Sequence, residues 1–508
     1  MKKTAYILLG VILAGAVSCN KWLEATSSSQ ISDEKLFSTR SGFHEVLNGL
    51  YTKLSDRSAY GLNYTLLANE MASYPFMTAV LNSMSSFQRH LYTTSICTDT
   101  QDLMWQTGYE VIANANKLLL ELDRHRDVIT DEDEYNLIKG EALAVRAMLH
   151  FDLIRMFGNA SWDGENASKF APPYVRVYSK EPEPQLTYSQ TAELLWEDIN
   201  ASLECLKSDP ILGNTGETFS LVANADGYWD NRRIHMNHCA VLALSARVAQ
   251  WQGDMPKAAS KAREALDEAI ACGLAEWMNA DDYWRSYASI GICDYQITSE
   301  GLFSMDTSTG THFSDWISLT FGMTNTSLTL DQTWCRSIFP AGDLSADEDI
   351  RGFSSWLAPN GTNMGLKKFW GIMYTVVISY DSSGNRVYEE MPYSGTLPII
   401  RMSEMQYIIC EDAILRSNVE DACAALDVVR THRGITTPLT RPATADEVWA
   451  ELEKEYYREF VGEGQLFYYL KRRYACGRAA VVDNYITDGS NLTYPYPVSE
   501  TIYGRVQE

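Results

Sequence analysis

Glu459 and Glu463 are the residues whose type and spacing come nearest to catalytic chemistry. Paired carboxylates hydrolyse a glycosidic bond when they flank that bond from opposite sides. These two lie about one turn apart on one predicted helix, beside Arg458, and that spacing favours ion pairs within or between helices. The sequence also contains no G-x-S-x-G, H-E-x-x-H or P-loop motif. We therefore predict no catalytic residues and no enzyme activity.

The run His235-Met-Asn-His238-Cys239 is the nearest approach to a metal site. On a helix, His235 and Cys239 would share a face, while His238 would point partly away. Core packing and helix capping are therefore favoured over metal ligation. Without Cys19, nine cysteines remain, an odd number with no C-x-x-C pair, and Cys239, Cys410 and Cys423 lie within apolar helical patterns. We predict no disulfide framework, no metal and no cofactor.

The first nineteen residues have the features of a lipoprotein export signal. Lys2 and Lys3 give a positive start, and an apolar run over 6–17 is too short for a lasting membrane span. Small residues then lead to Cys19, whose thiol could receive a lipid. An ordinary secretory signal with a chance cysteine is the alternative. We predict a signal peptide over 1–18, a lipidated Cys19 and a polar tether over 19–40, so that the lipid holds the protein to a membrane.

The composition indicates a large folded body with an acidic surface. The formal net charge is −24, and 45% of the residues are apolar and 11% aromatic. Such an apolar fraction is ample for a buried core. The acidic balance argues against nucleic acid as a partner, and against attraction of the protein's own charges to anionic headgroups.

The folded body, 41–508, is predicted to be mainly helical. Helical periodicity recurs along the chain, and two later pairs of alanine-rich helices have about the length of tetratricopeptide units. We expect these pairs to stack into a tetratricopeptide-like scaffold. Thr444-Ala-Asp-Glu447 is a capping-box pattern for the last long helix, and Gly158 is placed as a C-cap. The expected helices cover about 42–54, 102–123, 133–157, 232–252, 258–272, 403–415 and 419–430.

Two regions lack this helical period. The stretch 56–100 carries Tyr60, Tyr64, Tyr74, Phe76 and Phe87 among small polar residues, and we expect a shaped surface there. A longer region, about 279–394, is rich in Gly, Ser, Thr, Asn and Trp, with a strand expected over 373–380 and a hairpin turn at 381–384. We interpret it as a loop-rich, mixed insert that carries the binding surface, since binding residues are common on loops above a rigid scaffold. The alternative is that each Trp fills a local core.

Three segments together resemble the SusD/RagB family of outer-membrane nutrient-binding lipoproteins. Residues 141–158, EALAVRAMLHFDLIRMFG, resemble the family's E-A-x-x-x-R-A-x-x-x-F-D-L-x-R-x-x-G helix. Residues 397–407, LPIIRMSEMQY, continue to 424–434, AALDVVRTHRG. Residues 455–472, EYYREFVGEGQLFYYLKR, are similar to E-R-R-x-E-F-x-x-E-G-x-R-x-x-D-L-x-R. The departures are Tyr456, Tyr457, Leu466 and Tyr469, where the pattern has charged residues, and they put local ion pairs in doubt.

The resemblance implies a lipid-anchored protein on the cell-surface side of the outer membrane. It would capture an oligosaccharide and deliver it to a SusC-like TonB-dependent outer-membrane transporter. Sugar rings need flat apolar faces with hydrogen-bonding groups at the edges. The predicted ligand-binding residues are therefore aromatics of the two irregular regions: Tyr74, Trp284, Trp316, Trp356 and Trp370.

Three other functions fit parts of the sequence. A RagB-like lid that binds peptides would keep the scaffold and change the pocket. A glycoside hydrolase would need two carboxylates across a cleft. A structural helical-repeat adaptor would bind only protein.

Overall fold

The computed structural model describes most of the chain from Asp33 onward. The end of the predicted tether, 33–40, is part of the folded body, since a short helix covers Asp33–Leu36 and Phe37 is buried. The described residues are 33–77, 85–212, 224, 226–290, 293–306, 328–339, 349–353, 355–369, 375–380, 386–390, 396–439, 444–478 and 489–502. The predicted signal peptide and Cys19 lie outside them.

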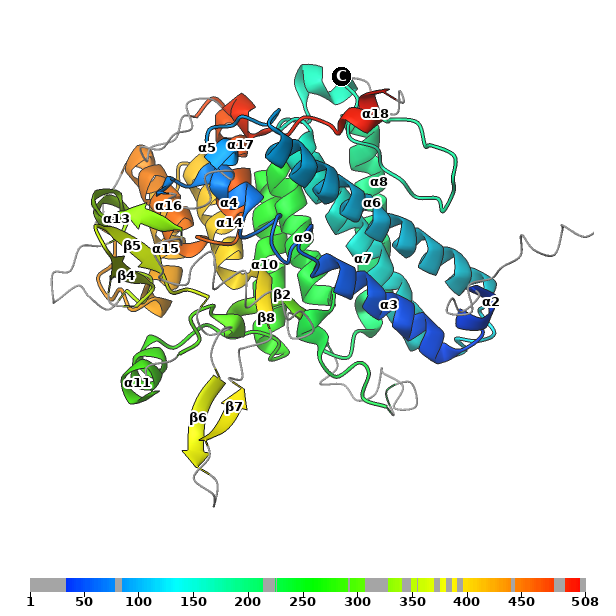
Figure 1. Ribbon diagram of the computed structural model, residues 1–508, viewed down its shortest axis with the longest axis horizontal. Coiled ribbons are helices and arrows are strands. Elements are labelled where there is room, and N and C mark those ends of the chain that lie inside the picture. The colour runs from blue at the N-terminus through cyan, green and yellow to red at the C-terminus, as the bar shows by residue number, and fades with distance from the viewer. Residues whose placement is uncertain are drawn as a thin grey trace, which may run out of the picture.

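Long helices of the N-terminal half form one side of the molecule, on the right in Figure 1. In chain order they pack against one another: α3 against α6, α6 against α7, and α7 against α8. The helices expected over 42–54, 102–123 and 133–157 are thereby confirmed, the second with a longer N-terminal end. The bounds are α2 Asp33–Leu36, α3 Arg40–Leu54, α6 Ser95–Arg124, α7 Glu132–Phe157 and α8 Tyr188–Cys205.

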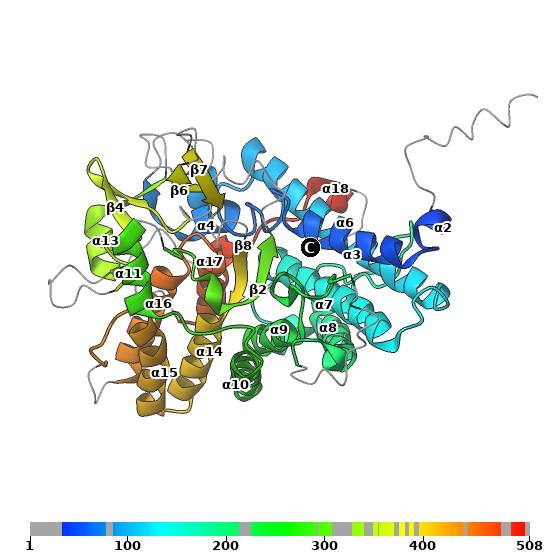
Figure 2. The same ribbon diagram turned by 90° about the horizontal axis from the view of Figure 1, so that it is seen from below.

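Paired helices continue the scaffold through the second half of the chain. Helix α9 packs on α10, α10 on α14 and α14 on α15, and the four stand side by side in Figure 2. This succession of antiparallel pairs confirms the predicted tetratricopeptide-like scaffold. None of the described helices is long and apolar enough to cross a bilayer. The bounds are α9 His238–Trp251, α10 Met255–Ala271, α14 Met402–Leu415, α15 Val419–His432, α16 Ala445–Glu459 and α17 Gln465–Ala475.

Side-chain caps explain where several of these helices begin. Thr444 Oγ1 accepts from the backbone N–H of Glu447, and the Glu447 carboxylate accepts from the N–H of Thr444, as the capping-box pattern predicts. Gly158 does follow the end of α7, but its backbone is extended rather than left-handed. A Cβ there would lie 2.6 Å from Tyr188 Oη, so the glycine permits a close approach.

The region 279–394 contains more regular structure than the sequence indicated. Its described residues include the α-helices α11 (Ala280–Ile290) and α13 (Gln332–Ile338). Three strands of it join β1 in an antiparallel sheet of order β1-β3-β5-β4, and β2 pairs with β8. The strand expected over 373–380 is present as β6, paired with β7, while the expected turn at 381–384 lies outside the described residues. The bounds are β1 Phe76–Met77, β2 Gly301–Asp306, β3 Thr329–Asp331, β4 Leu357–Asn360, β5 Asn363–Leu366, β6 Thr375–Tyr380, β7 Arg386–Glu390 and β8 Thr396–Arg401.

The aromatic stretch 56–100 is core, and its prediction as a shaped surface is wrong. Tyr60, Tyr64, Tyr74, Phe76 and Phe87 are all buried. The chain winds here through turns and short helices, so its aromatics enter the core without a regular period. The short elements here and elsewhere are α4 Ala68–Ser73, α5 Ser85–Gln88, α18 Val498–Ile502 and the 3-10 helices Gly164–Ser168, Leu206–Ser208, Arg232–Ile234, Thr298–Glu300 and Gly489–Leu492.

Candidate functional site

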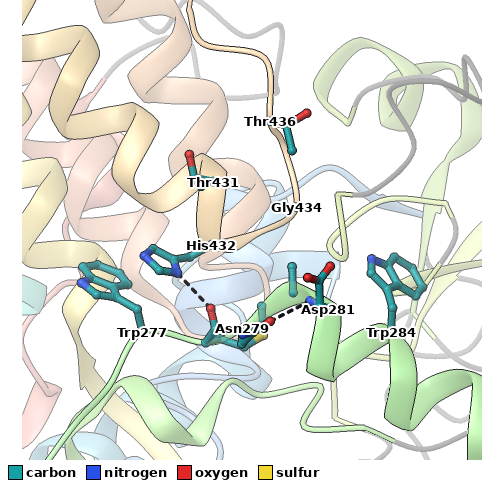
Figure 3. Close-up of a pocket in the computed structure, with 10 residues that line it drawn as sticks. Trp277, Asn279, Asp281, Trp284, Thr431, His432, Gly434 and Thr436 are labelled. Atoms are coloured by element: carbon teal, nitrogen blue, oxygen red, sulfur yellow. Dashed lines mark hydrogen bonds between the residues drawn. The ribbon is translucent and has the colours of Figure 1, made fainter.

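An open pocket of about 320 Å³ lies where the predicted insert begins, against the end of α15. Its lining comes from the segment between α10 and α11, from the first turns of α11, and from the end of α15 with the residues that follow it. Two indoles stand on opposite sides of the pocket with polar side chains between them (Figure 3). The lining residues are Trp277, Met278, Asn279, Ala280, Asp281, Trp284, Thr431, His432, Gly434 and Thr436.

The Trp277 indole is fixed by its neighbour from α15. It stacks on the His432 ring, with centroids 5.2 Å apart and an angle of 12° between the planes. His432 is oriented in turn by a 3.0 Å hydrogen bond between its Nδ1 and the carbonyl oxygen of Met278. Because a carbonyl only accepts, Nδ1 carries the proton in this bond. The indole, half-buried in the lining of the pocket, is thereby held in place.

Trp284 stands on the other side, on α11. Its ring meets Tyr283 and Tyr287 edge to face, with centroids 5.6 and 5.7 Å apart. Asn279 holds the start of that helix, because its Oδ1 accepts from the backbone N–H groups of Asp281 and Asp282 at 2.9 and 3.2 Å. Aromatic edges and a cap therefore position the second indole.

The polar groups between the indoles are exposed. Asn279, Asp281, Thr431 and Thr436 supply amide, carboxylate and hydroxyl groups to the pocket. Flat apolar faces combined with hydrogen-bonding edges fit a ring that has one apolar face and a polar rim.

The structure separates the predicted ligand-binding residues. Trp284 lines the pocket, whereas Trp316 and Trp370 lie outside the described residues. Tyr74 is 1% exposed and donates its hydroxyl to the carbonyl oxygen of Tyr457 at 2.8 Å. Trp356 is 0% exposed and lies beneath the Lys368 ammonium. A ligand cannot reach these two rings in this structure, because their faces pack in the core, and we assign both to packing.

Sequence reasoning missed Trp277 and His432. Trp277 stands two residues before the expected insert, and His432 lies within the second family-like segment, between Arg430 and Arg433. An aromatic just before a polar, helix-capping Asn was the available signal for Trp277. The contact between the two, across 155 positions of sequence (432 − 277 = 155), leaves no local pattern.

Glu459 and Glu463 belong to a buried ion-pair network, which we define by Arg351, Arg401, Arg433, Lys368, Glu300, Glu455, Glu459 and Glu463. Arg433 joins Glu300 and Glu459, each through contacts of 2.6 Å. Arg401 joins Glu459 at 2.5 Å to Glu463 at 2.8 Å. The predicted ion pairing is confirmed.

Burial and ion pairing oppose each other in this network. Burial alone would raise the pKa of Glu459, but the charges of Arg433 and Arg401 outweigh it and hold that pKa well below its ordinary value. Burial lowers the pKa of Lys368 to about 8 even though Glu463 is adjacent. The carboxylates are thus occupied by fixed cations, which suits a structural role.

Further buried charges connect the three family-like segments. Lys471, in the third, donates to the carbonyl oxygens of Arg155 and Gly158 at the end of the first, both at 2.8 Å. Two departures from the family pattern, Tyr456 and Tyr469, stack on each other with centroids 4.0 Å apart. An aromatic pair therefore stands where the pattern has charges.

The network also reaches the pocket. Glu300, which is paired with Arg433, accepts from the backbone N–H of Met278 at 3.1 Å. The carbonyl of Met278 is bound by His432. The backbone between Trp277 and Asn279 is therefore held from both sides.

His235, His238 and Cys239 do not form a cluster. His235 contacts Glu141 and His238 contacts Glu268, at 2.8 and 2.9 Å. Cys239 is buried, as are Cys410 and Cys423, and every cysteine that the structure describes is a free thiol. Within the described part of the chain, no group of three or more His, Cys, Asp or Glu residues could hold a metal ion.

Two family models match the chain. One, described as starch-binding and associating with the outer membrane, matches residues 21–210, and the model of the SusD family matches residues 355–503. The chain belongs to the SusD/RagB family, as the three segments predicted.

Individual relatives are distant. SusD-like proteins P25 and P2 of Formosa agariphila are 22% and 24% identical over 206 and 190 residues. These matches span 39% and 36% of this chain and only 38% and 35% of the relatives.

Solved structures share the fold over nearly the whole chain. A SusD superfamily protein from Bacteroides thetaiotaomicron has a TM-score of 0.67 at 19% identity, with 92% of this chain and 99% of that chain covered. A SusD-like carbohydrate binding protein from Bacteroides vulgatus has a TM-score of 0.65 at 16% identity, with 92% and 98% covered. At these identities the likeness concerns the fold.

Proposed function

We propose that this protein binds oligosaccharides in the pocket between Trp277 and Trp284. The two fixed indoles, with exposed amide, carboxylate and hydroxyl groups between them, are the observation that carries the proposal. The C–H face of a pyranose stacks on an indole, and its hydroxyls reach the polar rim. Such shallow sites bind with affinities on the order of micromolar to millimolar.

We further propose that the protein acts at the outer membrane and passes its ligand to a SusC-like TonB-dependent transporter. Family membership and the outer-membrane association named for the family model support this setting. Lipid on Cys19 would hold the protein at the cell surface, and the part of the predicted tether that precedes α2 would let it move against its partner. Modest affinity suits a protein that must release its ligand.

Affinity electrophoresis on a panel of purified glycans tests the binding proposal. We expect at least one glycan to retard the wild-type protein, and Trp277→Ala and Trp284→Ala each to reduce that retardation. Trp196→Ala is the matched control. Trp196 lies on α8, its half-buried indole is covered by the Lys257 ammonium, and it does not line the pocket. Retardation that survives both pocket substitutions would place the site elsewhere.

The glycan panel, together with a peptide library tested in parallel, separates the alternatives. A peptide-binding lid would bind peptides and no glycan, and a structural adaptor would bind neither. Release of shorter sugars during incubation would indicate a hydrolase. Deletion of the gene for a SusC-like transporter in the source organism, followed by measurement of uptake of the bound glycan, tests delivery.

A further inference from the structure

The charge of the pocket comes from a single acidic side chain. Among its described lining residues, Asp281 is the one carboxylate, and neither Lys nor Arg is present. Asp281 is exposed, on the first turn of α11, and Figure 3 shows it between the two indoles. A carboxylate accepts hydrogen bonds from sugar hydroxyls and repels a second carboxylate.

The start of α11 would ordinarily attract an anion, because the first backbone N–H groups of a helix are free and its dipole is positive there. Here Asn279 Oδ1 already accepts from two of those groups, at Asp281 and Asp282. The Asp281 and Asp282 carboxylates add negative charge to the same turn. The positive end of the α11 dipole is therefore already balanced by the Asn279 amide oxygen and the two carboxylates.

The three arginines nearest in sequence to the pocket each have acidic partners. Arg430 pairs with Asp427 and with Glu451, at 3.3 Å each. Arg285 pairs with Asp282 at 2.6 Å. Arg433, although it adjoins His432, is fully buried and bound by Glu300 and Glu459. Arg433 and Arg430 are thus each held by two carboxylates, while the exposed Arg285 is balanced by Asp282 on its own helix.

The faces of the indoles also favour neutral saccharides. The face of an aromatic ring is electronegative and favours the polarised C–H groups of a sugar. The Trp284 indole, on the same helix as Asp281, therefore favours the same neutral ligands as the carboxylate.

We propose that the pocket selects neutral saccharides over uronic acids, and that Asp281 is the residue that determines this specificity. The inference rests on the proposed glycan-binding function and adds the chemical class of the ligand. Neutral hydroxyls donate to Asp281, whereas a uronate in the same position brings two negative charges together.

The test compares a neutral oligosaccharide that binds with the same oligosaccharide oxidised at C6 to the uronic acid. Calorimetric titration is done at pH 8, where ordinary imidazoles are neutral, and at low salt, where charge effects are largest. We expect the wild-type protein to bind the neutral form about tenfold more tightly, and Asp281→Asn to remove most of that preference by tightening binding of the acid. Asp267→Asn, an exposed carboxylate on α10 that does not line the pocket, is the matched control, and it should retain the preference.

Equal binding of both forms by the wild-type protein, or an unchanged preference in Asp281→Asn, would overturn the specificity while leaving glycan binding intact. If instead the wild-type protein binds no neutral oligosaccharide of the panel, the proposed function fails, and the inference fails with it.

Discussion

The buried ion-pair network and the aromatic pocket meet at adjacent residues of one helix end, yet they differ in almost every property. Arg433 points inward and is saturated by carboxylates, while His432 supports an open indole. The network is made of the residues that are most recognisable in the sequence. The pocket is made of residues that the sequence hardly distinguishes. The charged residues that are recognisable in the sequence therefore stabilise the fold, and the proposed binding function is assigned to the pocket residues beside them.

The largest expected effect comes from removing one partner of the network. Arg433→Ala leaves Glu459 and Glu300 buried with part of their compensation lost, and should lower the free energy of unfolding by about 3–5 kcal/mol. Chemical denaturation measures this change. Lys207→Ala, which breaks an exposed pair with Glu204, is the control and should change stability by less than about 1 kcal/mol. Similar costs for the two variants would remove the distinction between network and surface.

Acid should weaken the network next. Burial alone would raise the pKa of Glu455, but Arg351 and Arg458 lower it to about 2. A carboxyl with a depressed pKa stabilises the fold above its ordinary value of 4.5, and this contribution is lost as the pH falls toward 2. The loss amounts to about 3 kcal/mol for this one group. The free energy of unfolding, measured from pH 7 to 2, should show this loss. It should fall less steeply with decreasing pH in Glu455→Gln than in the wild-type protein, and identical slopes would contradict the assignment.

A glycine of the third family-like segment tests the backbone that supports the network. Gly464 has φ +70°, and a Cβ there would lie 2.5 Å from the carbonyl oxygen of Tyr64. Gly464→Ala should therefore lower the free energy of unfolding by about 2 kcal/mol. Gly49→Ala is the opposite case, since it lies within α3 with open space around it, and it should stabilise by about 0.5–1 kcal/mol. Thermal unfolding compares the two, and equal effects would contradict the assigned strain.

The smallest effect on folding, and the largest on binding, is expected in the pocket. Trp277→Ala removes one stacking face and should weaken glycan binding about tenfold, while the protein stays folded at room temperature. Binding isotherms and circular dichroism of the same samples separate the two quantities. Trp196→Ala should leave affinity unchanged, and a parallel loss in both variants would indicate a general effect on folding.

The scaffold could be predicted from sequence because its signals are local. Thr444 and Glu447 form the expected capping box, and the helix expected over 133–157 is present as α7. The aromatic stretch around Tyr74 could not be predicted, because its rings enter the core from turns, where no period separates inside from outside. Trp356 also lies in a region without a regular period, where the sequence predicts a ligand-binding residue and the structure has a buried indole.

The pocket depends on tertiary contacts. Trp277 and His432 come from distant parts of the chain, and only the fold brings their rings together. Trp284 is predicted as a ligand-binding residue from composition alone, and its ligand-binding role stays a prediction. The helix that carries it escaped prediction, although Tyr283 and Tyr287 have the spacing of neighbours on one helical face.

The most direct test is a crystal structure of the protein with the neutral oligosaccharide that binds most tightly in the panel. The account predicts a sugar ring stacked on Trp277 or Trp284, with a hydroxyl within hydrogen-bond distance of the Asp281 carboxylate. A sugar bound at another surface, with the two indoles vacant, would contradict it.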